Sequence, residues 1–409
     1  MKKFRVLAPA FAAAALLAGC GGSDPGDQTP TVKYDRMVNF GDSLSDVGTY
    51  RTQLVAASGG GKYSINGGFS KEGINYTNWT EFLASVLQVA QPCPNEVGLQ
   101  SVGGLAFMAQ AVADNPACFS YAQGGARVTD PHGPGNAYYY TVLGSPSGQL
   151  GQITKPVVQQ VADFLAVNAS FSATDIVTVL AGGNDVFIDR GVGVDGTVAY
   201  FAAQGLLGTD AANAAISAAA ANAVLAMQQA GTEEASLVLD QIVAHGATHV
   251  VVVNLPDVAG TPDQTAWLAA AGAAVEPLHP HLTLDMVNAF NTALATGLGV
   301  SGADLQSSNA AVLYVDAFTA SDQQNANPAQ FGLTNVTSPA CDLTKTGVQV
   351  PGVGLVPLAS SLFCTKDSLV VDEATAATYE FADTVHPTPY GYKLLAQLVS
   401  SRLIAKGWL

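Results

Sequence analysis

The chain has 409 residues, of which 48% are hydrophobic, so it is long and apolar enough to bury a large core. Asp and Glu number 32 against 16 Lys and Arg, a formal net charge of −16, and the basic residues form no dense cluster. This balance excludes nucleic acid as an expected partner, because phosphate binding depends on clustered Lys and Arg. An acidic surface is typical of a protein that stays dissolved after export.

The first twenty residues predict export. Three basic residues within positions 2–5 precede an apolar run over residues 6–18, the pattern of a signal peptide, and the run is too short to span a membrane. Leu17-Ala18-Gly19-Cys20 resembles the lipobox of bacterial lipoproteins, whose cysteine carries the lipid. We expect a signal peptide over residues 1–19, a lipid-bearing Cys20 with a flexible tether to residue 33, and contact with the membrane only through this lipid, at the periplasmic or cell-surface side of the outer membrane; ordinary secretion is the alternative.

Short apolar runs alternate with longer helical patterns along the rest of the chain. The strands expected are residues 37–40, 176–180, 249–253 and 312–315, with a further one before Gly124, and the helices are residues 78–87, 156–165, 210–245, 284–295 and 389–406. This alternation is typical of a parallel sheet between two helical layers. The predicted fold class is therefore α/β, a three-layer α/β/α domain over residues 34–409. Residues 129–151 and 321–372 are rich in Gly, Pro, Asn and Ser and are interpreted as loops within it.

Four cysteines remain after Cys20, namely Cys93, Cys118, Cys341 and Cys364. In an exported protein they predict two disulfides, for which three pairings are possible. The pairing of Cys93 with Cys118 and of Cys341 with Cys364 is favoured, because each bond would close one Gly- and Pro-rich insertion. A zinc site is the rival interpretation, but neither pair shows the close spacing or the neighbouring His that zinc requires, so no metal is expected.

Ser43 is the candidate nucleophile, because it follows the first predicted strand within Gly41-Asp42-Ser43-Leu44. The common G-x-S-x-G elbow is absent, since its nearest match, residues 144–148, carries proline at the nucleophile position. Ser45 is placed to cap a helix after the strand. A plain turn followed by a helix cap is the alternative interpretation of this motif.

A base and its acid are predicted near the C-terminus, in Asp383-Thr384-Val385-His386-Pro387. An Asp three residues before a His can bond one imidazole nitrogen and leave the other free as a base. Asn184, in Gly182-Gly183-Asn184-Asp185, and the Gly-rich turn at residues 120–127 could supply donors to an oxyanion. For both of these segments a simple tight turn remains the alternative.

Together these four motifs resemble the blocks of the GDSL esterase/lipase family, also called SGNH hydrolases, whose fold is flavodoxin-like. The blocks correspond to residues 40–46, 121–126, 183–185 and 383–387, and the likeness extends to residues 75–79, 253–257 and 327–332. Thr49 and Ser120 stand where Asn is common in relatives, at positions without a catalytic role. The resemblance implies an ester hydrolase that needs no metal or organic cofactor.

The roles that this resemblance implies are assigned residue by residue. They are the nucleophile Ser43, the acid Asp383, the base His386, and the oxyanion donors Asn184, the Ser43 backbone N–H and one of Gly124 and Gly125, with Gly125 preferred. The expected partner is a small-molecule or lipid ester, of short or medium acyl length, because polar loops around residues 58–73 favour an open polar cleft. A lipase, phospholipase or carbohydrate acetylesterase of the same fold, and a catalytically idle surface binding lipoprotein, are the alternatives.

Overall fold

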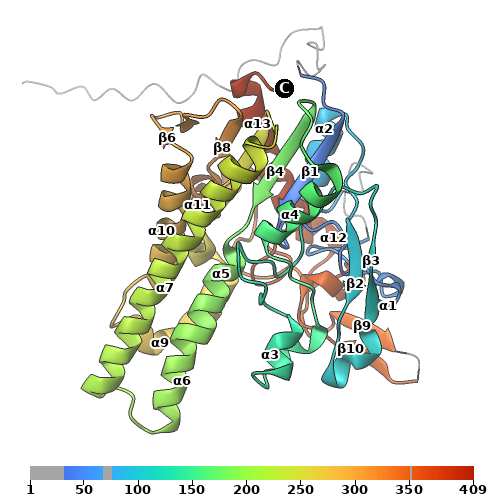
Figure 1. Ribbon diagram of the computed structural model, residues 1–409. Coiled ribbons are helices and arrows are strands. Elements are labelled where there is room, and N and C mark those ends of the chain that lie inside the picture. The colour runs from blue at the N-terminus through green and yellow to red at the C-terminus, as the bar shows by residue number, and fades with distance from the viewer. Residues whose placement is uncertain (1–31, 68–75, 351) are drawn as a thin grey trace, which may run out of the picture.

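A four-stranded parallel sheet lies at the centre of the computed structural model, which describes residues 32–67, 76–350 and 352–409 (Figure 1). The predicted signal peptide, Cys20 and most of the tether lie outside the described residues. The strands run in the order β1 (Arg36–Gly41), β4 (Asp175–Leu180), β5 (Val250–Val253) and β8 (Val312–Val315). All four lie where the sequence predicted them.

The segment at residues 119–123 runs along the outer edge of β1, where the sequence predicted a further strand. The Asn39 N–H donates to the Phe119 carbonyl over 2.9 Å, and the Tyr121 N–H donates back to the Asn39 carbonyl over 2.8 Å. Pairing is parallel, but only one isolated bridge forms, between Asn39 and Ser120. With this segment outside the first strand, the sheet has the flavodoxin-like order that the family resemblance implied.

Alternate side chains of each strand pack into two separate hydrophobic cores, one on each face of the sheet. Val250 and Val252 of β5 belong to the core under α4 (Val157–Asn168), α7 (Asp210–Leu237) and α10 (Leu282–Gly297). Val251 and Val253 belong to the core under α2 (Trp79–Leu87) and α13 (Pro389–Lys406). Parallel strands covered on both faces must be apolar on both, which explains the unbroken valine run. The predicted three-layer α/β/α architecture is confirmed.

The helix ends follow local capping chemistry. Asn78 caps α2 in a capping box with Glu81, and the Thr388 hydroxyl accepts the Gly391 N–H at the start of α13. The predicted helix over residues 210–245 is α7 continued by a π-helical turn, Val238–Val243. Further helices are α1 (Gln53–Ala57), α3 (Ala137–Thr141), α5 (Gly183–Ile188), α6 (Gly196–Ala203), α8 (Pro262–Leu268), α9 (Gly272–Val275), α11 (Ala317–Ala326) and α12 (Glu373–Ala376).

The two insertions predicted as loops are mostly irregular but carry short elements. The first contains α3, and the second contains the hairpin of β9 (Gly347–Val350) and β10 (Gly354–Pro357). The other short strands are β2 (Glu96–Leu99), β3 (Gln110–Asp114), β6 (Val300–Ser301) and β7 (Gln306–Ser307). Disulfides join Cys93 to Cys118 and Cys341 to Cys364, the pairing that the sequence favoured.

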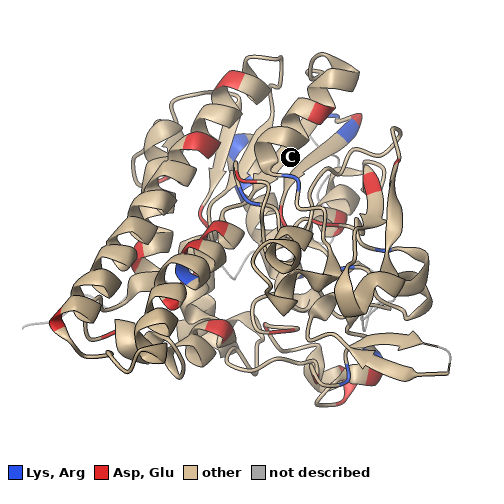
Figure 2. Cartoon of the chain, turned by 60° about the horizontal axis from the view of Figure 1, so that its bottom comes forward, with Lys and Arg blue, Asp and Glu red and all other residues tan. Residues whose placement is uncertain are grey.

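The positions of Lys, Arg, Asp and Glu are spread over helices and loops (Figure 2). Within the described residues, no helix combines the length and the apolar character needed to cross a bilayer.

Candidate active site

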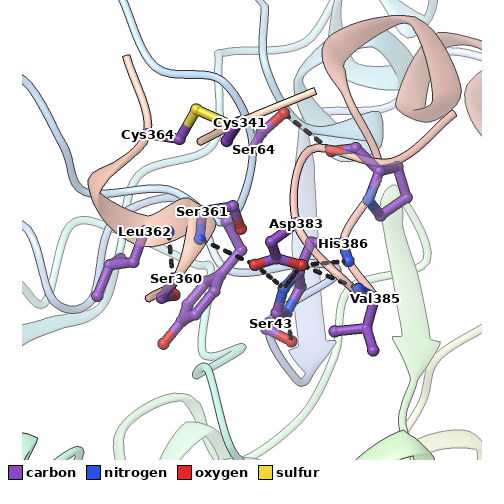
Figure 3. Close-up of polar contacts among 12 residues, drawn as sticks. Ser43, Ser64, Cys341, Ser360, Ser361, Leu362, Cys364, Asp383, Val385 and His386 are labelled. Carbon is purple, nitrogen blue, oxygen red and sulfur yellow. Dashed lines mark hydrogen bonds and ion pairs between the residues drawn. A yellow bond between two sulfur atoms is a disulfide. The ribbon is translucent and has the colours of Figure 1, made fainter. Parts of the chain in front are cut away.

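Three side chains named from the sequence meet at the carboxyl end of the sheet (Figure 3). Ser43 follows the last residue of β1 by two positions, whereas Asp383 and His386 lie in the loop before α13. His386 Nε2 is 2.8 Å from Ser43 Oγ, and His386 Nδ1 is 2.8 and 2.9 Å from the two oxygens of Asp383. The three side chains therefore form one continuous chain of hydrogen bonds.

Asp383 accepts hydrogen bonds from backbone as well as from the imidazole. The Ser361 N–H donates to Oδ2 over 2.8 Å, and the N–H groups of Val385 and His386 donate to Oδ1 over 3.0 and 2.8 Å. Burial alone would raise the pKa of Asp383, but the neighbouring His386 and these donors hold it well below its ordinary value. The group is thus an anion at neutral pH, which favours a proton on Nδ1 and leaves Nε2 to accept the Ser43 hydroxyl proton.

The Tyr63 ring packs against the imidazole of His386. The two rings lie 4.8 Å apart, centroid to centroid, and the Tyr63 hydroxyl accepts a hydrogen bond from the Gln152 amide. The neighbouring Ser64 hydroxyl donates to the Pro387 carbonyl over 3.1 Å (Figure 3). Residues 63–64 therefore hold the loop that carries His386.

The chain turns sharply between β1 and Ser43. Gly41 has φ +146°, and a Cβ there would stand 2.2 Å from the Leu180 carbonyl oxygen, so only glycine fits. The Leu44 N–H then donates to Asp42 Oδ1 over 2.9 Å. This turn is not followed by a helix: α1 begins only at Gln53, and the Ser45 hydroxyl accepts the Trp79 indole N–H over 3.2 Å. The prediction that Ser45 caps a helix was wrong, because its oxygen is used to join the turn to α2.

Gly124 and Gly125, the two glycines of the second block, differ in whether their N–H groups are already hydrogen-bonded. The Gly124 N–H donates to Asp46 Oδ2 over 2.8 Å and is therefore occupied. Among the described residues, the N–H groups of Gly125 and Ser43 donate no hydrogen bond. Gly125 also has φ +81°, and a Cβ there would meet the Pro134 carbonyl oxygen at 2.5 Å. Of the two glycines, Gly125 keeps a free donor.

Asn184 lies in the first turn of α5, at the end of β4. Its Nδ2 donates one hydrogen to the Ala126 carbonyl over 2.8 Å, and an amide carries a second hydrogen that this bond does not use. The next residue, Asp185, accepts from the Arg127 guanidinium over 2.9 Å and from the Val128 N–H over 3.1 Å. These bonds fasten the start of α5 to the Gly-rich turn.

A pocket opens beside Ser43, Asn184 and His386, and its walls are mainly apolar. Its apolar side chains come from the strand ends, α5, α11, the loop before α13 and α13 itself: Leu44, Leu180, Phe187, Leu255, Val258, Ala317, Ala320, Phe381, Val385, Leu394, Leu395 and Leu398. The open polar cleft expected from the loop composition is therefore wrong, because apolar side chains of strand ends, helices and the loop before α13 form these walls. In the part of the chain that the structure describes, no three potential ligand side chains gather into a metal site.

Sequence reasoning missed several residues that hold the site. Asp46 lies within the first motif, but its bond to Gly124 spans 78 positions and has no local signal. Tyr63 and the Ser361 N–H reach His386 and Asp383 from insertions whose composition indicated only loops. Ser43, Asn184, Asp383 and His386, by contrast, were all found from local motifs.

Residues 37–399 match the family described as GDSL-like Lipase/Acylhydrolase, a span that contains the whole site. No curated protein matches the chain.

Proposed function

The chain belongs to the GDSL-like lipase/acylhydrolase family, and on this basis we propose that it is a serine esterase, which hydrolyses carboxylic esters through an acyl-enzyme at Ser43. The observation that carries the proposal is the 2.8 Å contact between Ser43 Oγ and His386 Nε2, with Asp383 bonded behind the imidazole. A serine hydroxyl is a weak nucleophile unless a base removes its proton, and this arrangement supplies that base.

The reaction proceeds in two halves. Ser43 Oγ attacks the ester carbonyl while His386 Nε2 takes its proton, and the imidazolium then gives that proton to the departing alcohol oxygen. Water attacks the resulting acyl-enzyme, again losing its proton to His386, and the proton returns to Ser43 Oγ as the carboxylic acid leaves. The anionic Asp383 stabilises the imidazolium in both halves.

Three donors are assigned to the negative oxygen that develops in each half. They are the Ser43 N–H, the Gly125 N–H and the second amide hydrogen of Asn184, all of which have no partner among the described residues. Donors that are already in place stabilise the transition state without reorganisation, and one such donor contributes about 10²- to 10³-fold in kcat in comparable enzymes. Gly124 is not assigned this role, because Asp46 occupies its N–H.

The acyl chain is assigned to the apolar pocket, and we propose short to medium chain lengths. Apolar walls favour a hydrocarbon chain, and α11 and α13 supply part of these walls. Rates on p-nitrophenyl esters of graded acyl length test this assignment. A steady rise towards long-chain esters, with activation at a lipid interface, would instead identify a lipase.

The decisive experiment replaces Ser43 and uses Ser45 as the matched control. Ser43→Ala is expected to lower kcat by about 10⁶-fold, as for other serine hydrolases, with unchanged circular dichroism. Ser45→Ala, which loses only the bond from Trp79, is expected to keep most of the activity. A serine-directed phosphonate should label the wild-type protein at Ser43 in a peptide map. Turnover retained by Ser43→Ala would contradict the proposal.

We further propose that residues 34–409 act as one catalytic domain, exported by residues 1–19 and held at the outer membrane by lipid on Cys20. The two disulfides are compatible with an exported protein. Cys20→Ser is expected to move the protein from the membrane fraction to the soluble fraction. Retention of this variant in the membrane would contradict lipid attachment.

A further inference from the structure

Glu380 lies on the wall of the substrate pocket, and no residue that the structure describes donates a hydrogen bond to its carboxyl group. Its side chain is only 8% exposed, yet neither carboxyl oxygen accepts a hydrogen bond from any residue that the structure describes. The residue lines the same pocket as Ser43, Asn184 and His386. A buried carboxyl group without partners is costly to the fold, so its presence at a binding pocket points to a ligand that completes it.

Two other polar side chains on this pocket already have hydrogen-bond partners. Asp42 accepts the Leu44 N–H, and Asn184 donates to Ala126. Asp257 has one buried oxygen without a partner among the described residues, but its carboxyl group interacts with the Asn325 side chain. Glu380 is thus the acid of this wall whose whole carboxyl group is available to a bound molecule.

Glu380 lies at the base of the short hairpin that carries His386, and both residues line the same pocket. Residues 380–388 form a short hairpin, in which the Ala382 N–H donates to the His386 carbonyl over 2.7 Å and the Thr388 N–H donates to the Glu380 carbonyl over 2.8 Å. Two residues of extended chain, roughly 7 Å, separate Glu380 from Ala382. A chain seated in the pocket with its carbonyl at Ser43 would therefore occupy the cavity that Glu380 lines.

Backbone packing holds the carboxyl group in place. Gly391 in the first turn of α13 also lines the pocket, and a Cβ there would stand 2.8 Å from Glu380 Oε1. Burial raises the pKa of Glu380 to about 7, so near neutral pH the group exists both as the acid and as the carboxylate. Both forms accept a hydrogen bond, which suits a neutral hydroxyl better than an anionic group.

We infer that Glu380 is a specificity residue, which accepts a hydrogen bond from a hydroxyl group on the substrate chain that occupies the pocket. The preferred substrates are then hydroxylated esters rather than plain alkyl esters. This inference rests on the proposed esterase function. The hydroxyl could belong to the acyl chain, as the pocket assignment implies, or to the alcohol, and the same chemistry recognises both.

The test compares pairs of esters that differ only by a hydroxyl in place of a terminal methyl. In the acyl arm, ethyl esters of ω-hydroxyalkanoic acids of graded length are paired with the matching alkanoates. In the alcohol arm, butyrates of ω-hydroxyalkyl alcohols are paired with the matching alkyl butyrates. Each kcat/KM is measured by acid release, and the readout is the ratio within a pair. Binding of a pocket hydroxyl should favour the hydroxylated member by about tenfold in one arm, since a buried acceptor left unpaired weakens binding of the methyl analogue.

Glu380→Leu and Glu380→Gln separate recognition from a purely structural role. Glu380→Leu should remove the preference for the hydroxylated member and raise kcat/KM for the alkyl member, because it extends the apolar wall. Glu380→Gln keeps an acceptor oxygen and should keep part of the preference. Glu373→Gln, which removes an exposed acid from α12, is the matched control and should leave every ratio unchanged.

The outcomes distinguish this inference from the proposed function. Hydrolysis of the plain esters without a preference in either arm would overturn the role of Glu380 and leave the esterase intact. A preference that survives in Glu380→Leu, or equal losses on both members of a pair, would overturn that role as well. A preference in the alcohol arm alone would support recognition and place the hydroxyl in the leaving group. Failure to hydrolyse any ester would overturn the proposed function itself.

Discussion

The hairpin at residues 380–388 carries two buried carboxyl groups, one at its tip and one at its base, whose pKa values are shifted in opposite directions. Asp383 at the tip is 4% exposed and Glu380 at the base is 8% exposed. The first is surrounded by donors and its pKa lies well below the ordinary value, while the second has no donor among the described residues and its pKa rises to about 7. Depth of burial is nearly the same at both places. His386 and the hydrogen-bond donors around Asp383 therefore account for the difference in pKa between the two groups.

The backbone explains why the donors gather at the tip. At the turn, the N–H groups of Val385 and His386 have no ladder partner and point at Asp383. At the base, the nearby N–H groups are used by the backbone, since Thr388 donates to the Glu380 carbonyl and Glu380 donates to Asn335. A turn offers unpaired donors to a side chain, whereas a strand pair does not.

The largest expected effect comes from neutralising the acid at the tip. Asp383→Asn should lower kcat by about 10⁴-fold, because an amide cannot stabilise the imidazolium and favours the wrong proton position on His386. Steady-state kinetics on a p-nitrophenyl ester measure this loss. A rate within a few fold of wild type would show that the donors around Asp383 serve the fold and not the reaction.

The next largest effect is expected when the segment that carries one hydrogen-bond donor to Asp383, the Ser361 N–H, is loosened. Ser361 stands close to Cys364, so Cys341→Ala with Cys364→Ala should loosen the segment whose N–H bonds Asp383 (Figure 3). We expect a loss of about 2–4 kcal/mol in the free energy of unfolding, measured by urea denaturation, together with a lower kcat.

The matched control is Cys93→Ala with Cys118→Ala, whose disulfide closes a loop of similar length, 25 positions against 23. It should cost similar stability with a smaller change in kcat, because Asp46 and the Tyr50 hydroxyl hold Gly124 independently of it. Equal losses of kcat in the two double variants would show that the Ser361 donor has no special role.

Glu234 is a third buried acid, and it lies in the hydrophobic core. Glu234 on α7 is fully buried, both of its oxygens have no partner among the described residues, and its pKa is raised well above the ordinary value by burial and by Asp185 and Asp42. With a raised pKa in the folded state, the unfolded chain loses this proton first as pH rises, so the group destabilises the fold progressively above the ordinary Glu pKa.

Glu234→Met should remove that penalty and stabilise the protein by about 1–3 kcal/mol near neutral pH. The gain should grow from acidic to mildly alkaline pH, which melting curves at several pH values would reveal. Parallel pH dependences of wild type and variant would contradict a protonated Glu234 in the folded state.

The smallest effect is expected at Asp342, whose carboxyl group accepts hydrogen bonds but is not buried. Hydrogen bonds from Thr344 and Lys345 lower the pKa of Asp342 to about 2, as donors do at Asp383, but the carboxyl group is open to solvent. Asp342→Asn should leave kcat and the melting temperature within the scatter of replicate measurements, since water replaces the lost bonds. A clear loss of stability would show that hydrogen bonds to a carboxyl group stabilise the fold even where that group is not buried.

The sequence predicted what depends on local pattern and missed what depends on distant contacts. The valine run of β5 and the Asp383–His386 spacing are local, and each predicted what the structure shows. The segment at residues 119–123 pairs with β1 through a single isolated bridge, so its extended form depends on β1 rather than on its own residues. The polar pocket was inferred wrongly, because loop composition carries no information on which helix faces line a cavity.

The Ser43–His386 contact joins residues 343 positions apart, so this site has one of the longest sequence separations that the chain permits. Such contacts form late in folding, because a long loop must close before they can stabilise anything. A chain that stops before residue 386 lacks the base, however well its first strands have formed. Hydrolytic activity consequently reports completion of synthesis and folding, and a half-made chain in transit should be unable to attack the esters around it.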